Sequence, residues 1–497
     1  MSSYAVTCYK SYISRKIRML KWVSSNAVTS NKSNKAGKRK NINNVQELAG
    51  SEKDCIFAGR KNKLMKTEVA KYPEEITEDG LLMYGQTSMD NCLAVLTHYA
   101  HNAEDADEET RRDIVRLAED WLEAKKSKDK TIEYDPDELM DAVAEPVQSD
   151  LFADFFKVPF PAPEHPKFTF IDLFAGIGGF RLAMQNLGGK CVYSSEFDSQ
   201  AQKTYFANYG DMPFGDITKE STKSFIPKNF DVLCAGFPCQ AFSLAGKRLG
   251  FKDETRGTLF FQVEDILRRH QPKAFFLENV KGLAIHDHGR TLKTILEHLD
   301  DAGYNVVPPK ILNAMDYGVP QHRERIYIVG FRKDLGIKAE DYHYPEPTTP
   351  GDKRPKFKDV MEDHEVSVKY YLSTQYIDTL KRHKARHAAK GNGFGYEIID
   401  INGVSNAIVV GGMGRERNLI IDNRLTNFTP ITHIKGEVNH EGIRRMTPRE
   451  WARLQGFPDT FRIVVADASA YKQFGNSVAV PAIQATAEQE LKTLKLI

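Results

Sequence analysis

The sequence lacks the features that mark several special classes of protein. Its 497 residues include only six cysteines, none in a CxxC pair and none beside a histidine cluster. A disulfide scaffold and a structural zinc site therefore do not fit, no metal is expected, and reduced thiols indicate a cytosol-like compartment. No uninterrupted apolar run reaches 18 residues, so we expect no membrane-spanning helix. With 41% hydrophobic and 27% charged residues, the composition is that of a globular chain of two to four domains.

A net charge of +2 conceals two blocks of opposite sign. Residues 1–66 contain 15 Lys or Arg against 3 Asp or Glu, whereas residues 67–156 contain 8 against 24. The basic block is polar and lacks the apolar segment of a secretory signal, so we expect a disordered extension. A transit peptide, a nucleic-acid-binding arm, and an over-long reading frame whose translation starts at Met65 in place of Met1 are the alternatives.

The acidic block, extended to residue 165, is expected to be a partly helical accessory region. Ile114, Leu117, Trp121 and Leu122 form one apolar stripe at helical spacing, with charged residues elsewhere. No motif in this block indicates chemistry. Four prolines between residues 159 and 166 then predict a stiff linker into the next domain.

From residue 167 the pattern changes to that of an α/β domain. The apolar run 168–174 predicts a buried strand, and Gly176, Gly178 and Gly179 form a turn before a helix at 180–187. Such a strand, turn and helix open a doubly wound sheet and place a ligand at the end of the first strand. The turn is neither a GxxxxGK[ST] phosphate loop nor the six-residue dinucleotide fingerprint, which disfavours ATP and NAD.

Residues farther along suit an adenosine ligand without a phosphate chain. A second strand ends at Glu196, about twenty residues on, where a carboxylate can bind a ribose diol. Asp216 and Ile217 end the next strand–helix unit and could hold an adenine ring. S-adenosylmethionine is the obvious candidate for this cofactor.

Later strands end in residues with reactive or polar side chains. Cys239 follows a strand that begins near Asp231, although a cysteine in such a loop is more often a packing residue, as we expect for Cys234. Glu278 emerges from the apolar run 274–280 at the same sheet edge. Because burial favours its neutral form, it suits a general acid, with a surface carboxylate as the alternative. Alternation in a later extended segment points three side chains to one face, which suits an anion or a base edge: Gln321, Arg323 and Arg325.

Six short motifs occur in the order found in one enzyme family. They are FAGIGG at 174–179, PCQ at 238–240, ENV at 278–280, QxRxR at 321–325, REWARLQGFP at 449–458 and GNSV at 475–478. In these motifs the chain resembles the DNA cytosine-5 methyltransferases, over roughly residues 167–488. Within that family it is most similar to HpaII-type enzymes, which modify CCGG, and this likeness includes residues 391–396 and 411–418.

The resemblance implies a mechanism. Cys239, as a thiolate, would add to C6 of a cytosine, and Glu278 would donate a proton or hydrogen bond to N3. Arg323 would hold the base carbonyl, with Arg325 and Gln321 supporting the loop. The target base must leave the stacked duplex, and contacts in the pocket must offset the cost of unstacking.

The same resemblance implies binding residues. S-adenosylmethionine would contact Phe174, Gly176, Ile177, Gly178, Glu196, Asp216, Ile217, Pro238, Asn476, Ser477 and Val478. DNA would contact Gln240, Ser243, Arg415 and Arg417, and the two arginines could either read guanine or grip phosphates. The basic run 381–387 indicates a surface that contacts the DNA backbone.

The predicted fold is α/β: a doubly wound, Rossmann-like methyltransferase sheet with a smaller target-recognition domain and a helical N-terminal extension. The expected segments after 1–66 and 67–165 are a catalytic and cofactor domain at 166–332, a target-recognition domain at 333–443, and a hinge at 444–497 that returns to the catalytic domain.

The predicted function is methylation of the inner cytosine of CCGG in double-stranded DNA, as in a restriction–modification system. An RNA (tRNA) cytosine-5 methyltransferase and a non-catalytic DNA-binding protein of the same fold are the alternatives. We expect a cytoplasmic, nucleoid-associated monomer, with a restriction endonuclease that acts on the same site as a candidate partner.

Overall fold

The computed structural model describes residues 91, 93–95, 97–98, 158–238, 259–391, 393, 395–410, 415–430 and 436–497. The predictions for the basic extension, for the apolar stripe at 114–122 and for Cys239, Gln240 and Ser243 lie outside these ranges. The chain divides into two compact units, one made of Met1–Phe155 with Lys219–Lys228 and the other of Phe156–Thr218 with Asn229–Ile497. In the first unit, Asn91 donates a hydrogen bond of 3.2 Å to Thr222 on the short helix α9 (Glu220–Lys223).

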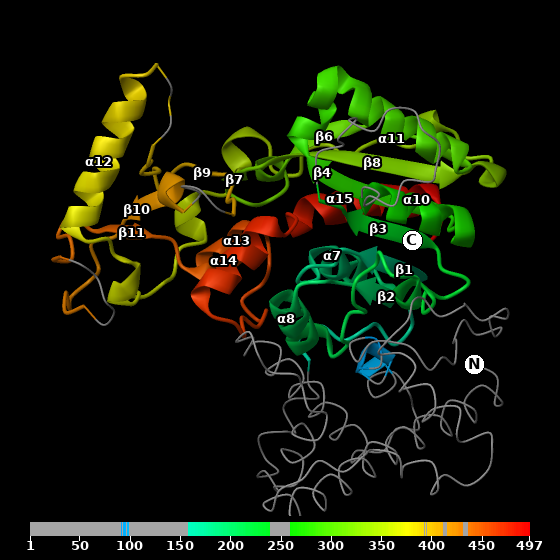
Figure 1. The fold of residues 1–497 in the computed structure, drawn as a ribbon, viewed down its shortest axis with the longest axis horizontal. Helices are drawn as coiled ribbons and strands as arrows, with labels where there is room; N and C mark the ends of the chain where they lie inside the picture. The colour runs from blue at the N-terminus through cyan, green and yellow to red at the C-terminus, as the bar shows by residue number, and fades with distance from the viewer. Residues whose placement is uncertain are drawn as a thin grey trace, which may run out of the picture. The chain divides into compact units, whose positions relative to one another are not determined.

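A seven-stranded mixed sheet forms the centre of the second unit (Figure 1). Its strands are β1 (Phe168–Leu173), β2 (Gly189–Ser195), β3 (Val232–Gly236), β4 (Ala274–Val280), β5 (Tyr304–Val306), β6 (Lys310–Asn313) and β8 (Glu324–Arg332). The order is β2-β1-β3-β4-β8-β5, with β6 also paired to β8. Strands β1 to β4 are parallel, whereas β8 runs antiparallel to β4, β5 and β6. The predicted α/β sheet is confirmed, but as a mixed sheet.

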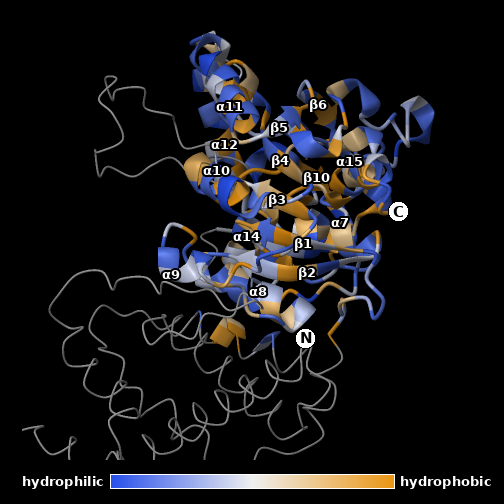
Figure 2. Cartoon of the chain, turned by 90° about the vertical axis from the view of Figure 1, so that its right-hand side faces the viewer, coloured by the Kyte–Doolittle hydropathy of each residue, from blue (hydrophilic) through white to orange (hydrophobic). Residues whose placement is uncertain are grey.

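Helices cover both faces of this sheet. They are α7 (Gly179–Asn186), α8 (Ser199–Tyr209), α10 (Leu259–His270), α11 (Arg290–Asp301) and α15 (Val480–Thr493). Figure 2 shows α10 and α11 on one side of the sheet and α7 and α15 on the other. Because neither face meets water, the strands are apolar runs and not alternating patterns, as in β4, which is buried from Ala274 to Asn279.

Residues around and after β8 build a smaller part of the same unit. Its elements are β7 (Gln321–His322), α12 (Thr374–Ala388), β9 (Ser405–Asn406), β10 (Leu419–Ile421), β11 (Ile443–Arg445), α13 (Pro448–Leu454) and α14 (Asp467–Asn476). Figure 1 shows α12, β10 and β11 at the end of the unit away from the large sheet. Ile377 and Leu380 hold α12 in an apolar cluster with Leu419 and Ile443 from the two strands.

Short 3₁₀ helices occur in the connections. They are η2 (Lys281–Ala284), η3 (His286–Gly289), η4 (Ala314–Asp316), η5 (Lys333–Leu335), η6 (Ala339–Asp341), η7 (Gly351–Lys353), η8 (Phe357–Asp359), η9 (Val368–Tyr370) and η10 (Glu416–Asn418). In the part of the chain that the structure describes, no helix combines the length and apolar character needed to cross a membrane.

A buried ion cluster joins β11 to α13 within the smaller part. Arg444 on β11 donates to both carboxylate oxygens of Glu450, at 2.7 and 2.8 Å, and to Asp422 at 2.8 Å. All three residues are buried. Although burial works against it, hydrogen bonds from Arg424 and Arg444 lower the pKa of Asp422 to about 2. Loss of one partner would leave a buried charge unpaired, so the cluster fixes β11 against the start of α13.

The proline-rich stretch before the sheet is packed within the second unit. Phe160 contacts the rings of Tyr209 and Phe461, at centroid distances of 5.9 and 6.0 Å, and its N–H donates to the carbonyl of Asn208. The stretch predicted as a stiff linker is therefore packed at Phe160. The Phe160 side chain packs against Tyr209 on α8 and against Phe461 before α14. The local sequence does not reveal these partners, because they are distant along the chain.

Glu490 on α15 predicts a pH-dependent stability. It is fully buried, and neither carboxylate oxygen has a hydrogen-bond partner within the described residues. Burial raises its pKa from an ordinary 4.5 to about 8. Between these two pKa values the folded protein keeps a proton that the unfolded chain releases. The free energy of unfolding should therefore fall as the pH rises from about 4.5 to about 8. Glu490→Gln should flatten that decline and raise the stability at the alkaline end, measured by urea unfolding at several pH values.

A matched control is Glu488→Gln, which changes a partly exposed carboxylate on the same helix. It should leave the pH dependence as it is in the unmodified protein. If Glu490→Gln keeps the original slope, Glu490 does not bind the extra proton.

Candidate active site

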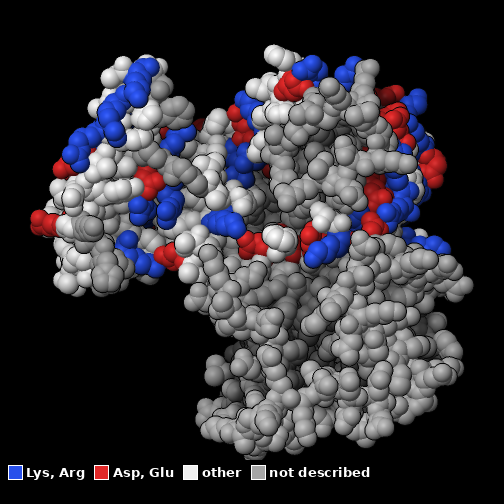
Figure 3. Space-filling model, viewed as in Figure 1, with Lys and Arg blue, Asp and Glu red and all other residues white. Residues whose placement is uncertain are grey.

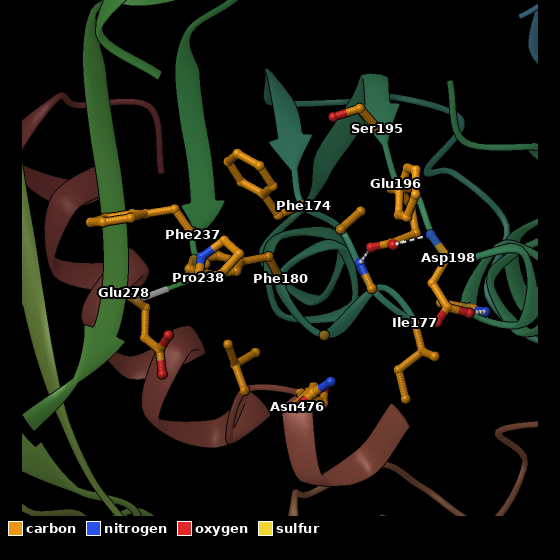
Figure 4. A pocket seen from close by; sticks show the side chains of 18 of the residues that line it. Phe174, Ile177, Phe180, Ser195, Glu196, Asp198, Phe237, Pro238, Glu278 and Asn476 are labelled. Atoms are coloured by element: carbon orange, nitrogen blue, oxygen red, sulfur yellow. Dashed lines mark hydrogen bonds between the residues drawn. The ribbon is translucent and has the colours of Figure 1, made fainter. Parts of the chain in front are cut away.

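A cavity of about 1210 Å³ lies at the carboxyl ends of β1 to β4. Because parallel strands all end on the same side of a sheet, segments far apart in the sequence meet there. Figure 4 shows Glu278 and Pro238 at one end of the cavity and Glu196 at the other. The lining includes most of the residues predicted for the cofactor: Phe174, Gly176, Ile177, Glu196, Asp216, Ile217, Pro238, Asn476, Ser477 and Val478.

Gly178, which was also predicted to contact the cofactor, does not line the cavity. Its φ is +85°, and a Cβ atom there would lie 2.3 Å from the ring of Tyr209. The Tyr209 hydroxyl donates to the Gly178 carbonyl at 2.7 Å. Gly178 therefore lets α7 begin close to a buried tyrosine, where no side chain would fit.

Glu196 is held by the backbone around the first turn. Its Oε2 accepts the N–H of Gly176 at 2.7 Å and its Oε1 accepts the N–H of Asp198 at 2.6 Å (Figure 4). Burial raises the pKa of Glu196, and these two N–H groups partly oppose the shift. The carboxylate is thus fixed in orientation and keeps acceptor capacity for hydroxyl donors inside the cavity.

Phe197 lines the same cavity and was not predicted from the sequence. It is 79% exposed, although it is a large aromatic residue. An open aromatic face beside a fixed carboxylate suits a ligand that presents a flat ring and a diol. The available signal was an aromatic residue placed directly after the acid that ends a strand.

The end of the chain contributes to the cavity, as the family resemblance implied. Asn476, Ser477 and Val478 follow α14 and lie against the first turn. A Cβ atom on Gly179 would lie 2.7 Å from Val478 Cγ2 and 3.0 Å from Ser477 Oγ. The glycine therefore permits a close approach between segments about 300 residues apart.

The other end of the cavity carries a buried carboxyl group beside a guanidinium group. Glu278 is 8% exposed, and its Oε1 lies 3.1 Å from Nε of Arg325. Burial raises the pKa of Glu278, although Arg325 and Arg323 act in the opposite direction. The neutral acid is thus favoured more than in water, as predicted. Next to it, Asn279 donates to the Phe237 carbonyl at 2.9 Å and positions the segment that ends at Pro238.

Arg323 and Gln321 have other partners. Arg323 lines the cavity, but its Nη atoms donate to the carbonyls of Ile408 at 3.0 Å and of Ser477 at 2.6 Å. Gln321 does not line the cavity; it accepts the N–H of Ile408 at 3.0 Å and donates to the carbonyl of Leu454 at 2.8 Å. The alternation that predicted a shared face is present, but these two side chains bind backbone.

The arginines predicted to contact DNA are exposed on the smaller part. Arg415 and Arg417 flank Glu416, which is buried and pairs with Arg445 at 2.9 Å. The guanidinium carbon of Arg415 lies 5.4 Å from the centre of the Tyr471 ring. Because Glu416 is held inside by Arg445, Arg415 and Arg417 face solvent.

The family of the chain follows from comparison with known proteins. Residues 168–492 match the model described as C-5 cytosine-specific DNA methylase, and the chain belongs to this family. It is therefore a DNA (cytosine-5) methyltransferase, the class that the order of the motifs predicted.

The similarity to HpaII-type enzymes is also confirmed. Type II methyltransferase M.HpaII of Haemophilus parainfluenzae is 71% identical over 329 residues, which are 66% of this chain and 90% of the relative. Type II methyltransferase M.DsaV of Dactylococcopsis salina is 45% identical over 67% of this chain and 88% of the relative. A crystal structure of S. pombe Dnmt2 methyltransferase aligns with 66% of this chain and 99% of that chain, at 19% identity and a TM-score of 0.49.

Enzymes of this family use S-adenosylmethionine, and the residues around the first turn fit that cofactor. Glu196 offers a fixed acceptor for a ribose diol, Phe197 offers an aromatic face, and the turn lacks a phosphate loop. Within the described ranges, no group of three His, Cys, Asp or Glu side chains could hold a metal ion.

Phe197→Ala should weaken binding of S-adenosylmethionine. Stacking on an aromatic side chain contributes about 1–3 kcal/mol, so the dissociation constant should rise about 5- to 150-fold. Titration calorimetry with S-adenosylmethionine measures the change. Ile285→Ala, which removes another exposed hydrophobic side chain from outside the cavity lining, should leave the affinity unchanged. Equal affinities of the Phe197→Ala and unmodified proteins would rule out stacking on Phe197.

Proposed function

We propose that this DNA methyltransferase transfers a methyl group from S-adenosylmethionine to C5 of the inner cytosine of CCGG in double-stranded DNA. The observation that carries the proposal is one cavity with a site suited to adenosine at one end and a buried acid at the other. The 71% identity to M.HpaII supports HpaII-type specificity. Both relatives described above are named type II methyltransferases, which supports a role in restriction–modification.

Glu278 and Cys239 would supply the acid and the nucleophile. Cys239, directly after Pro238, would add as a thiolate to C6 of the flipped-out base and leave when the C5 proton is lost. Glu278 would give its proton to N3 during the addition, because burial keeps that proton on the carboxyl group to a higher pH. S-adenosylmethionine supplies the methyl group when bound.

Arg325 is the better candidate to hold the base carbonyl, in place of Arg323. Its Nε lies 3.1 Å from Glu278, so its guanidinium group faces the same part of the cavity. The Nη atoms of Arg323 are taken up by backbone carbonyls of Ile408, Gly475 and Ser477. Arg323 and Gln321 would therefore act as positioning residues.

The remaining parts of the proposal concern DNA and partners. Residues 166–332 would carry catalysis and the cofactor, 333–443 would read the target, and 444–497 would return the chain to the catalytic domain. Exposed Arg415 and Arg417 would read guanine in the major groove or grip phosphates, and Gln240 and Ser243 would also contact DNA. A monomer suffices because one active site methylates one strand, and a cognate endonuclease would act on the same site.

Replacement of the two reactive residues separates their roles. Cys239→Ser should abolish methyl transfer and preserve binding to a CCGG duplex. Glu278→Gln should lower kcat about 100- to 10,000-fold, since an amide can donate a hydrogen bond but cannot give up the proton. In the unmodified protein, kcat/KM should decline as the pH rises through the raised pKa of Glu278. Single-turnover kinetics measure both variants, and methylation that survives Cys239→Ser would refute the assignment of the nucleophile.

The target sequence can be tested with labelled methyl groups. Matched duplexes that contain CCGG, CGCG or GGCC, and a structured RNA, are incubated with the protein and labelled S-adenosylmethionine. We expect label in the CCGG duplex alone. Label in another duplex would preserve the chemistry and refute the specificity, whereas label in RNA alone would refute the choice of substrate.

A further inference from the structure

Two neighbouring residues of α14 contact the segment that follows β2. Lys472 forms an ion pair with Asp198, and Gln473 donates to the carbonyl of Gln200 at 2.7 Å. The two partners of the ion pair are 274 residues apart in the sequence. Both residues of α14 line the cavity, although no step of the proposed methyl transfer uses them.

An ion pair alone does not assign a role to a residue. Figure 3 shows Lys and Arg beside Asp and Glu at several places on the described surface, and most exposed pairs contribute little to stability. Lys492 and Glu488 on α15 form such a pair, with side chains that are 53% and 41% exposed. The side chains of Lys472 and Asp198 are similarly exposed, at 55% and 32%. A role for Lys472 must therefore come from what its partner holds.

Asp198 connects α8 to the end of the cavity that suits adenosine. Its Oδ1 accepts the N–H groups of Gln200 at 2.9 Å and of Ala201 at 3.2 Å, which caps the helix. Its own N–H donates to Oε1 of Glu196 at 2.6 Å (Figure 4). Its Oδ2 pairs with Lys472. The ion pair therefore restrains the residue that both caps α8 and orients the Glu196 carboxylate.

Gln473 fixes the backbone from which Lys472 reaches Asp198. The Gln473 side chain is buried, and its Oε1 accepts the hydroxyl of Thr204 on α8 at 2.9 Å while its Nε2 donates to Gln200. Loss of a partner by a buried amide is costly, so α14 and the start of α8 keep one relative position. Although burial works against it, hydrogen bonds from Lys472 and from the N–H groups of α8 lower the pKa of Asp198, which keeps the carboxylate charged.

A ligand in the cavity would strengthen this ion pair. Asp198 and Lys472 line the cavity, so a ligand displaces water from them and lowers the effective dielectric constant around the pair. An interaction that is stronger in the complex than in the free protein contributes to affinity. We propose that Lys472 is a positioning residue for S-adenosylmethionine, which acts through Asp198 to hold Glu196 and Phe197 where they bind the adenosine. This inference rests on the proposed function only in placing the adenosine beside Glu196.

The test is Lys472→Gln, which removes the charge and keeps a long polar side chain. On the scale of exposed ion pairs, the dissociation constant of S-adenosylmethionine should rise about 2- to 5-fold, measured by titration calorimetry without DNA. Lys472→Arg should retain the affinity. In steady-state kinetics KM for S-adenosylmethionine should rise by the same factor with kcat unchanged, because Asp198 and Glu278 lie at opposite ends of the cavity (Figure 4).

Two further measurements separate positioning from a direct effect of charge on the cofactor. S-adenosylhomocysteine lacks the positive charge of the sulfonium group, so its dissociation constant should rise by the same factor as that of S-adenosylmethionine. In the protein without cofactor, hydrogen exchange in a peptide that contains residues 196–201 should be faster in Lys472→Gln, because the segment is less restrained. In an Asp198→Asn background, Lys472→Gln should cause no further loss of affinity.

Lys492→Gln is the matched control. It removes a charge of similar exposure from an ion pair on α15, outside the cavity lining, and should change neither the affinity nor the exchange. The proposal is overturned if Lys472→Gln binds S-adenosylmethionine as tightly as the unmodified protein, or if it affects S-adenosylmethionine but not S-adenosylhomocysteine. Unchanged exchange at residues 196–201, or a control variant that behaves like Lys472→Gln, would overturn it as well.

These measurements distinguish the role of Lys472 from the proposed function, since calorimetry and hydrogen exchange need neither DNA nor methyl transfer. A protein that labels none of the duplexes but shows the predicted changes would refute the proposed function and keep the role of Lys472. Label in the CCGG duplex, with an unchanged affinity in Lys472→Gln, would do the reverse.

Discussion

Three buried polar side chains hold the active site together from segments that are distant in sequence. Gln321, Arg323 and Gln455 bind the backbone at Ile408, at Leu454 and between Phe474 and Ser477. A buried carbonyl left without a partner costs about 1–3 kcal/mol, so each segment is restrained to one position. As a result the GNSV motif at 475–478 lies beside the first glycine turn. The backbone at Ile408, a few residues before Arg415, is also held in one position.

The two carboxyl groups of the cavity have different environments, and these suit different roles. Glu196 is oriented by two backbone N–H groups, which favour an acceptor for hydroxyl groups. Glu278 follows an apolar strand and faces Arg325, so burial favours its protonated form while the guanidinium group fixes its orientation. Neighbouring groups, not residue type, thus suit one carboxyl group to ligand binding and the other to proton transfer.

Arginine has two opposite uses in the smaller part of the unit. Arg444 is buried and paired with two carboxylates, so its charge positions β11 and α13 and is not available to a ligand. Arg382, Arg386, Arg415 and Arg417 are exposed, which leaves guanidinium groups accessible to a polyanion. Arg445 pairs with the buried carboxylate of Glu416. Because Glu416 points inward, Arg415 and Arg417 on either side of it lie at the surface.

The sequence by itself determined the four parallel strands β1 to β4, the order of the motifs and the residue types at these strand ends, because apolar runs and turns are local features. It also placed Glu278 correctly as a buried acid, since the run before it predicts burial. Only the tertiary structure decided that Phe160 is packed, that Gly178 does not line the cavity and that Phe197 does. Alternation placed Gln321, Arg323 and Arg325 on one face, but their partners lie in segments up to 154 residues away. Those partners are set by how the whole chain packs, and a local pattern does not contain that information.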